Sequence, residues 1–286
     1  MATFKFIPNT TRFNLTNAMA LSEAAGLAYQ EPAQIKDVVL NQWGMTHCEC
    51  FEKEDTQAFI AANDKVIIVS YRGTESKEDW MTDAKCKLIP YKQGRAHFGF
   101  NKTFKFSAKW LKDTVNKFDN GKQTLWVTGH SLGAALATLA VDFLLDKENM
   151  FAVNGLYMFG SPRVGDKYFA ENFDKNFKFR TFRFVNDEDI VTRVPLRSMG
   201  YKHIGTVRYI DCHGDLHCNN VKWKRWISKA KSVAARSLDG YAQLKGQYPN
   251  SIADHSMSLY IKHVKANCKP KETVAINNFQ DYMKNI

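Results

Sequence analysis

The sequence predicts an α/β fold with a mixed, mostly parallel central sheet flanked by helices. After residue 100, segments with helical periodicity alternate with short apolar segments, which indicates parallel strands joined by helical crossovers. Before that point, three apolar segments follow one another directly, which is typical of an antiparallel meander. The alternating helical segments are residues 102–118, 132–145 and 168–176, and the strand segments are 124–128, 155–159 and 181–185.

The remaining elements follow in chain order. Apolar residues recur at helical spacing over residues 17–28, with Thr16 as the expected N-cap. A long basic helical segment is expected from Val221, and residues 269–286 have the pattern of an irregular tail. The strands expected outside the alternating region are residues 45–52, 58–62, 65–71 and 205–210.

Composition restricts the class of protein. The chain has 286 residues, of which 44% are hydrophobic and 24% charged, and these values exclude disordered and collagen-like classes. Without internal repeats or low-complexity linkers, we predict a single domain over residues 1–286. No apolar stretch approaches the length of a membrane span, and the first residues lack a signal-peptide pattern. These features favour a cytoplasmic or peripheral membrane protein, with secretion as the alternative left open.

The charge balance and the cysteines limit the partners. Lys and Arg outnumber Asp and Glu by 40 to 29, which gives a net charge of +11. Such a surface attracts polyanions, including anionic lipid headgroups, although a soluble protein can be basic without such a partner. Six cysteines are too few for a disulfide framework in a chain of this length, so mostly free thiols are expected.

A Gly-x-Ser-x-Gly pattern lies between a predicted strand and a predicted helix. Gly129, Ser131 and Gly133 are its fixed positions. The pattern predicts a nucleophile elbow, whose turn is so tight that both glycine positions must lack a side chain. The helix that follows presents free N–H groups, and the N–H of Leu132 is placed to stabilise an oxyanion. The bare pattern also occurs by chance, but its flanks favour a catalytic serine.

A serine nucleophile needs a base, and the base needs an orienting acid. In elbow-type hydrolases the acid and then the histidine follow the serine along the chain. Three acid candidates, Asp187, Glu188 and Asp189, lie at the end of a predicted strand, and spacing alone does not separate them. His255, at the start of a late helix, is the favoured base. The competing histidines are His203, His213, His217 and His263.

Several motifs resemble those of the class 3 lipases, a family of filamentous-fungal triacylglycerol lipases with bacterial and plant relatives. The resemblance covers about residues 16–266 and includes the serine motif. Asp254-His255 resembles the end motif of bacterial members, which favours a bacterial protein. The other matching segments are Tyr71-Arg72-Gly73-Thr74, His97-Phe98-Gly99-Phe100, residues 159–165, and Val185-Asn186 followed by Asp189-Ile190-Val191.

The resemblance implies an α/β-hydrolase fold with Ser131 as nucleophile, Asp189 as acid and His255 as base. It also implies that Thr74 supplies the second oxyanion donor. No cofactor or metal is implied. The reaction expected is hydrolysis of a lipid carboxylic ester through an acyl-enzyme, as in a triacylglycerol lipase or esterase. The alternatives are a phospholipase A1 and a non-catalytic membrane-binding protein on the same scaffold.

The sequence departs from the family pattern in two places. Thr192 replaces a proline that is common after the acid motif. The segment between Thr74 and Trp80, where the lid is expected to start, is highly charged and lacks bulky apolar residues. This second departure weakens the case for interfacial activation.

Two further segments could bind a partner. Residues 221–236 form a basic amphipathic pattern with Trp223 and Trp226 on one face, which fits either an anionic membrane surface or a surface helix packed on the core. A nucleic-acid role has no other support. The segment Cys212-His213-Gly214-Asp215-Leu216-His217-Cys218 carries zinc-binding residue types, but its spacing favours a loop with two ordinary cysteines, and a disulfide between them is a further alternative.

Overall fold

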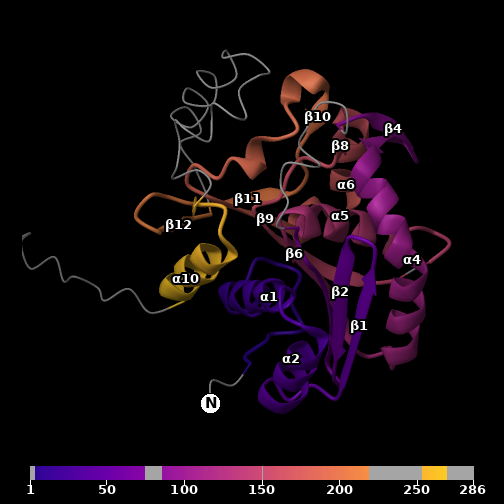
Figure 1. The fold of residues 1–286 in the computed structure, drawn as a ribbon, viewed down its shortest axis with the longest axis vertical. Coiled ribbons are helices and arrows are strands. Elements are labelled where there is room, and N and C mark those ends of the chain that lie inside the picture. The colour runs from indigo at the N-terminus through magenta and orange to yellow at the C-terminus, as the bar shows by residue number, and fades with distance from the viewer. Residues whose placement is uncertain (1–3, 75–85, 150, 219–252, 269–286) are drawn as a thin grey trace, which may run out of the picture.

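The computed structural model describes residues 4–74, 86–149, 151–218 and 253–268. In these ranges, an eight-stranded sheet runs through the centre of the molecule in the order β1-β2-β3-β6-β7-β9-β11-β12 (Figure 1). Its strands are β1 (His47–Lys53), β2 (Thr56–Ala62), β3 (Val66–Tyr71), β6 (Thr124–His130), β7 (Val153–Phe159), β9 (Thr181–Asn186), β11 (Thr206–Ile210) and β12 (Leu216–His217).

The strand directions confirm a mixed, mostly parallel sheet. Strands β1, β2 and β3 form an antiparallel meander, and β3, β6, β7, β9 and β11 are parallel neighbours. The short strand β12 closes the far edge in the antiparallel direction. Because parallel neighbours point the same way, the carboxyl ends of β3, β6, β7 and β9 meet at one edge, where α/β sheets place their sites.

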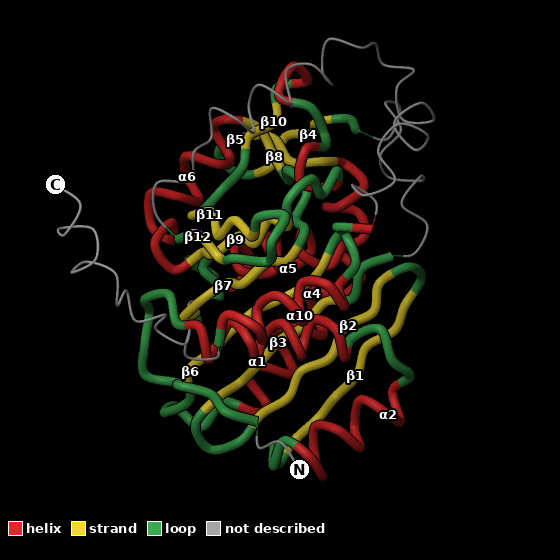
Figure 2. Tube along the Cα trace, turned by 90° about the vertical axis from the view of Figure 1, so that its left-hand side faces the viewer, coloured by secondary structure: helices red, strands yellow, loops and turns green. Residues whose placement is uncertain are grey.

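Helices cover both faces of the sheet. Between the sheet and the helices, each face has a separate apolar core. Figure 2 looks onto the face covered by α1 and α10, and Figure 1 shows α4 and α5 on the opposite side. Helix α5 is buried almost all round, which explains its continuous run of Ala and Leu. The helices are α1 (Leu15–Leu27), α2 (Pro32–Asp37), α4 (Phe98–Phe118), α5 (Leu132–Leu144), α6 (Lys167–Phe177) and α10 (Met257–Asn267).

Two predicted helix starts were wrong, for reasons of capping. Helix α1 is capped by Asn14, whose side chain accepts from the N–H of Asn17 at 3.1 Å, and the expected cap Thr16 lies inside the helix. Helix α4 begins at Phe98 because the Nδ1 of His97 accepts from the N–H of Phe100 at 3.2 Å. An imidazole is an uncommon cap, so sequence pattern alone did not indicate it.

A second, four-stranded sheet was not predicted. Its order is β10-β8-β5-β4, and its strands are β4 (Leu88–Tyr91), β5 (Gly94–His97), β8 (Gly165–Asp166) and β10 (Tyr201–Lys202). These strands have two to four residues, and three of them contain a glycine or a proline, so they carry no alternating pattern. The predicted basic segment 221–236 and the tail 269–286 lie outside the described residues. In the described ranges, no helix has both the length and the apolar character needed to cross a bilayer.

The burial of α5 gives a test of the core. Leu139 is fully buried, whereas Leu145 at the end of the same helix is 38% exposed. We expect Leu139→Ala to lower the free energy of unfolding by about 3 kcal/mol, because it removes apolar contacts and leaves a cavity. Leu145→Ala is the matched control, with an expected loss below about 1 kcal/mol. Urea titrations measure both values, and equal losses would contradict this account of the core.

Candidate active site

The candidate site is assembled from four strand ends. Ser131 follows β6 directly, Gly160 follows β7, and Thr74 and Asp189 each lie three residues beyond the ends of β3 and β9. His255 comes from the far end of the chain, just before α10. The sheet therefore brings together residues that are up to 181 positions apart, from Thr74 to His255.

Ser131 occupies a strained turn that only its neighbours' small size permits. Its backbone has φ 57° and ψ −127°, a conformation that side-chain-bearing residues rarely adopt. A Cβ added at Gly129 would lie 2.4 Å from the carbonyl oxygen of Gly133, and one at Gly133 would lie 2.2 Å from that of Tyr71. The N–H of Ser131 donates to Phe159 O at 3.0 Å, which ties the turn to β7.

Two backbone segments flank the serine where an oxyanion would form. Leu132 is the first residue of α5, so its N–H has no acceptor within the helix. On the other side, a Cβ added at Gly73 would lie 3.1 Å from the Cβ of Ser131, so the chain leading to Thr74 passes directly beside the serine. Backbone donors on both sides of a nucleophile are what a tetrahedral oxyanion requires.

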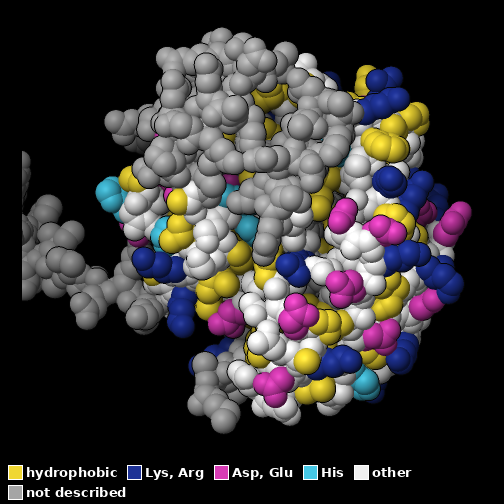
Figure 3. All heavy atoms as spheres, viewed as in Figure 1, with side chains coloured by type: hydrophobic (Ala, Val, Ile, Leu, Met, Phe, Trp, Pro, Cys, Tyr) yellow, Lys and Arg dark blue, Asp and Glu magenta, His cyan; other side chains and the backbone are white. Residues whose placement is uncertain are grey.

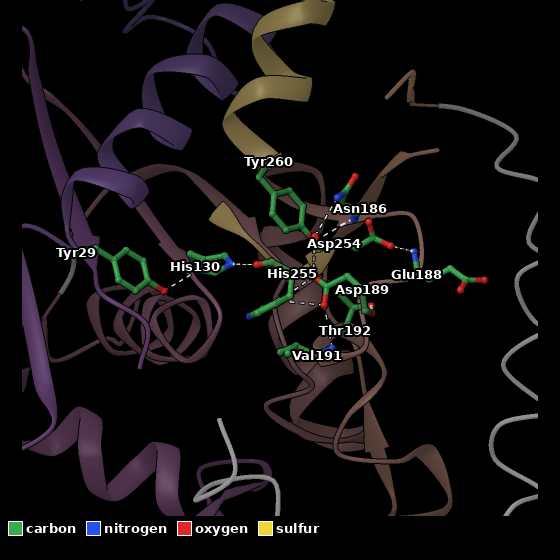
Figure 4. A network of polar contacts seen from close by, with 10 residues as sticks. All are labelled: Tyr29, His130, Asn186, Glu188, Asp189, Val191, Thr192, Asp254, His255 and Tyr260. Carbon is green, nitrogen blue, oxygen red and sulfur yellow. Dashed lines mark hydrogen bonds and ion pairs between the residues drawn. The ribbon is translucent and has the colours of Figure 1, made fainter. Parts of the chain in front are cut away.

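Asp189 and His255 form a buried pair (Figure 4). The Nδ1 of His255 lies 2.9 Å from both carboxylate oxygens of Asp189, and neither residue has more than 1% of its surface exposed. The Tyr260 hydroxyl donates to Asp189 Oδ2 at 2.6 Å, and the Val191 N–H donates to Oδ1 at 2.9 Å. The carboxylate therefore accepts hydrogen bonds from three residues.

These contacts favour an ionised Asp189 and fix the tautomer of His255. Burial alone would raise the pKa of Asp189, but the facing His255 ring and the hydrogen bonds from His255 and Tyr260 outweigh it, so the pKa is lowered. Since an ionised carboxylate only accepts, the Nδ1 of His255 must carry the proton. The Nε2 of a neutral His255 then has a free lone pair, as a general base requires.

The proposed base and the proposed nucleophile are not hydrogen-bonded to each other in this structure. The Ser131 hydroxyl oxygen and the His255 Nε2 are both buried, and neither has a hydrogen-bond partner among the described residues. Buried polar atoms without partners are rare and call for an explanation. A proton acceptor and a hydroxyl left uncommitted beside one sheet edge fit a nucleophile and base whose hydrogen bond tightens when substrate arrives.

Gly160 and His130 hold the pair in place, and neither was predicted to do so. A Cβ added at Gly160 would lie 2.7 Å from Cε1 of His255 and 2.8 Å from Oδ2 of Asp189. His130 stacks on His255 with ring centroids 4.5 Å apart, and its Nε2 lies 2.8 Å from the backbone oxygen of His255. The hydroxyl of Tyr29 lies 2.7 Å from the other ring nitrogen of His130. The sequence signal for each was its place in a motif: His130 lies in the Gly-x-Ser-x-Gly pattern, and Gly160 lies in the matching segment 159–165.

The competing acids and histidines have other partners. Asp187 Oδ1 accepts from the Tyr209 hydroxyl, and the side chain of Glu188 does not face the imidazole in Figure 4. His203, His217 and His263 contact the Thr192 carbonyl, Asp211 and Asn186 respectively. Of the three acidic residues that spacing left open, Asp189 is the one the structure places against His255.

Of the other predicted site features, the three tryptophans lie outside the described residues and the two cysteines lie within them. Trp80, Trp223 and Trp226 lie outside the described residues. Cys212 and Cys218 carry free thiols, so the alternative of a disulfide between them was wrong. Within the described ranges, no cluster of three potential metal ligands was found.

A cavity of about 760 Å³ adjoins the site between α1 and α10. Thr74, His130 and His255 are among the residues that line it. Its volume is in the range typical of sites for small organic ligands. The apolar side chains that line it are Leu27, Val38, Trp43, Met257 and Ile261.

The carboxyl group next to His255 predicts a pH-dependent stability. Burial raises the pKa of Asp254 to about 6, and the charges of Asp187, Asp189 and Glu188 add to the rise. A hydrogen bond from the Glu188 N–H lowers the pKa and offsets part of this rise. The folded state then binds more protons than the unfolded state between about pH 4 and pH 6, so stability falls as pH rises through that window. Asp254→Asn removes this loss. We expect its melting temperature to exceed that of the wild type by about 2 °C at pH 7.5, with no difference near pH 4.

The control for this measurement is Asp64→Asn, which changes an exposed aspartate in the β2–β3 turn. Its melting temperature should follow the wild type at both pH values. A gain for Asp254→Asn that is the same at pH 4 and pH 7.5 would show that the substitution acts through packing rather than through titration.

Comparison with known proteins gives consistent matches. The family Lipase (class 3) matches residues 68–199. Secreted mono- and diacylglycerol lipase A of Penicillium cyclopium is 34% identical over 167 residues, which cover 54% of this chain and 52% of that protein. Phospholipase A1-II 1 of Oryza sativa subsp. indica is 31% identical over 170 residues, covering 51% of this chain and 43% of that protein. The chain spans about half the length of the curated relatives it matches.

Solved structures agree with the sequence matches. The crystal structure of a lipase from Rhizopus microsporus var. chinensis has a TM-score of 0.56 at 29% identity, covering 68% of this chain and 73% of that one. The Rhizomucor miehei lipase in its propeptide complex has a TM-score of 0.54 at 26% identity, covering 71% and 69%. The fold is therefore that of an α/β-hydrolase. Residues 68–199 match the class 3 lipase family, and the motifs and the fold around them agree with that match.

Proposed function

We propose that the protein is a serine carboxylic-ester hydrolase that acts on lipid esters. The observation that carries this proposal is the buried Asp189–His255 pair, held at 2.9 Å, at the same sheet edge as the strained Ser131. An imidazole held in this tautomer takes the proton of a hydroxyl nucleophile. No other hydroxyl among the described residues combines a nucleophile elbow with such a base.

The reaction would proceed in two halves through an acyl-enzyme. His255 Nε2 takes the proton of Ser131 as its oxygen attacks the ester carbonyl, while the N–H groups of Leu132 and Thr74 stabilise the oxyanion. The bond to the alcohol then breaks, and His255 returns its proton to the departing oxygen. Water, deprotonated by the same imidazole, attacks the acyl-enzyme and releases the carboxylic acid. The sequence of steps needs no cofactor.

The cavity supports an ester with a substantial apolar part. Its lining is mostly apolar and includes Leu27, Met257 and Ile261 from α1 and α10. Thr74, His130 and His255 add polar groups to the same lining. On the described part of the face in Figure 3, Lys and Arg are interspersed with Asp and Glu, which suits an uncharged ester better than a polyanion. The match of residues 68–199 to the class 3 lipases supports the same choice of substrate class.

A second candidate is hydrolysis of the sn-1 ester of phospholipids. It is favoured by the similarity to phospholipase A1-II 1 of Oryza sativa. The proposed chemistry at Ser131 is the same for both substrates, so the two candidates differ only in the alcohol that leaves.

Substitution of the proposed nucleophile tests the function. We expect Ser131→Ala to lower hydrolysis of a p-nitrophenyl ester series, from acetate to palmitate, by at least about 10³-fold, because the covalent step is lost. Ser22→Ala is the matched control. Ser22 is a buried serine whose hydroxyl donates to the Met19 carbonyl, and its loss should leave kcat unchanged.

Natural lipids then separate the candidates. Diacylglycerol emulsions and phosphatidylcholine vesicles should both be assayed for released fatty acid. Faster release from diacylglycerol supports the lipase proposal, and release from the sn-1 position of phosphatidylcholine supports the phospholipase. If the wild type were as inactive as Ser131→Ala on every ester, the proposal would fail and a non-catalytic role at membranes would be favoured.

The hydroxyl of Tyr260 gives a further prediction about the acid. It donates to Asp189 Oδ2 at 2.6 Å, so Tyr260→Phe removes one of the hydrogen bonds that lower the pKa of Asp189. We expect kcat to fall by about tenfold, since a hydrogen bond to a charged group contributes about 1.5–3 kcal/mol. The acid limb of the pH–rate profile should move to higher pH as the pKa of Asp189 rises.

Tyr209→Phe is the control for that variant. Tyr209 makes the same kind of bond, to Asp187 Oδ1 at 3.0 Å, on an aspartate that does not contact His255. Its kcat and pH profile should match those of the wild type. Similar losses in both variants would mean that the tyrosines act through general stability.

A further inference from the structure

Two buried arginines, one in β9 and one in the loop before β8, have incompletely matched charges. Arg183 lies within β9 and Arg163 in the loop before β8, and each is only 5% exposed. In the described residues, the guanidinium of Arg183 makes no hydrogen bond and no ion pair, and its Nε is fully buried. Arg163 donates through Nη1 to the carbonyls of Arg193 and Pro195, but its Nε is buried without a partner.

Further basic groups surround this pair. Burial and then the charges of Arg197 and Arg183 lower the pKa of Arg163 to about 9, and burial chiefly lowers the pKa of Arg183 to about 10. Burial and the charges of Arg183 and Arg163 hold the pKa of His203 well below its usual value. Asp174 adds a negative charge near Arg183, but its Oδ1 is engaged by the N–H of Gly205 at 2.7 Å.

A buried guanidinium without a partner is costly in free energy. Arg208 on the neighbouring strand shows how other contacts can stabilise such a charge. Arg208 on β11 lies with its guanidinium carbon 4.4 Å from the ring centroid of Phe13 and 5.0 Å from that of Phe182. Its Nη1 also donates to the Val207 carbonyl. Cation–π contacts compensate Arg208. Arg183 has no such ring contact among the described residues, so its charge needs another partner.

We propose that the cluster of Arg163, Arg183 and His203 binds a small inorganic anion, which we identify as chloride. The unpartnered Nε–H groups of the two arginines are its donors, and Arg197, which is exposed, adds positive charge on the solvent side. A monatomic ion with one charge suits this buried setting, because a phosphate would bring more charge and lose more hydration. The anion supplies the negative charge that Asp174 does not provide in full.

The anion would lie behind the loop that carries Asp189. Arg163 holds the carbonyls of residues 193 and 195, and the Nε2–H of His203 donates to the Thr192 carbonyl at 2.8 Å. The Thr192 hydroxyl in turn donates to the backbone oxygen of Asp189 at 2.8 Å. An anion that fixes the two arginines therefore also fixes the rear of this loop.

Thermal unfolding in matched salts tests the proposal without reference to catalysis. The wild type is melted in sodium chloride and in sodium gluconate of the same ionic strength. At about ten times the dissociation constant, chloride should raise the melting temperature by about 3 °C over gluconate. The rise should saturate with chloride concentration, unlike a general salt effect. A third series in sodium phosphate distinguishes chloride from an oxyanion.

Arg183→Leu should lose the chloride response and be at least as stable as the wild type in gluconate, because it removes an unmatched buried charge. Arg208→Leu is the matched control and should keep the full response. If Arg183→Leu does not fold, Arg183→Gln replaces it, with the same expected loss. A wild type that melts alike in chloride and gluconate overturns the proposal, as does a chloride response that survives in the Arg183 variant. A response to phosphate alone overturns the choice of chloride.

Discussion

Asp189 carries a carboxylate with no exposed surface at the end of β9, and its hydrogen bonds fix the elements around it. Burying an isolated carboxylate costs far more than a domain can tolerate, so donors must surround it. His255 and Tyr260 come from the chain around the start of α10, and Val191 comes from the loop of Asp189 itself. Helix α10 is therefore positioned against the sheet by polar contacts as well as by its apolar face. The space these groups fill also explains why a glycine follows β7, since any side chain on Gly160 would overlap the pair.

His130 links this pair to the other half of the site. The backbone oxygen of His255 can only accept, so the Nε2 of His130 carries a proton, and its Nδ1 lies 2.7 Å from the Tyr29 hydroxyl. One imidazole thus connects the chain just after α1, the elbow and the backbone of His255. Because His130 precedes Ser131 directly, the position of the base relative to the nucleophile is set through a single residue. The middle position of the elbow motif therefore has a structural role of its own.

The sequence was informative where structure is local and much less so elsewhere. The order of parallel strands and helices was predicted correctly because each has its own periodicity, and the elbow follows from two glycines around Ser131. Spacing did not choose among Asp187, Glu188 and Asp189, because consecutive side chains at a strand end differ only in direction. Tyr260 and Gly160 were not predicted as contacts of the acid, since those contacts join residues 71 and 29 positions apart. The short second sheet has no periodicity long enough to detect.

The loop from Asp189 to Pro195 is held from both sides, and the two sides follow the same electrostatic logic. In front, a buried anion is matched by donors from three residues. Behind, the buried Arg163 guanidinium and the His203 imidazole donate to carbonyls of the same loop. A carboxylate that stabilises a transient imidazolium contributes most when it does not have to move as the charge appears, because reorganisation consumes the stabilisation it offers. Rigid contacts at the rear of the loop therefore bear on the chemistry at its front, although Arg163 and His203 contact neither Ser131 nor His255 among the interactions described here. The buried Arg163 guanidinium that contributes to this rigidity carries an electrostatic cost of its own, and that cost is why a counter-charge behind the loop follows from the placement of Asp189 in front of it.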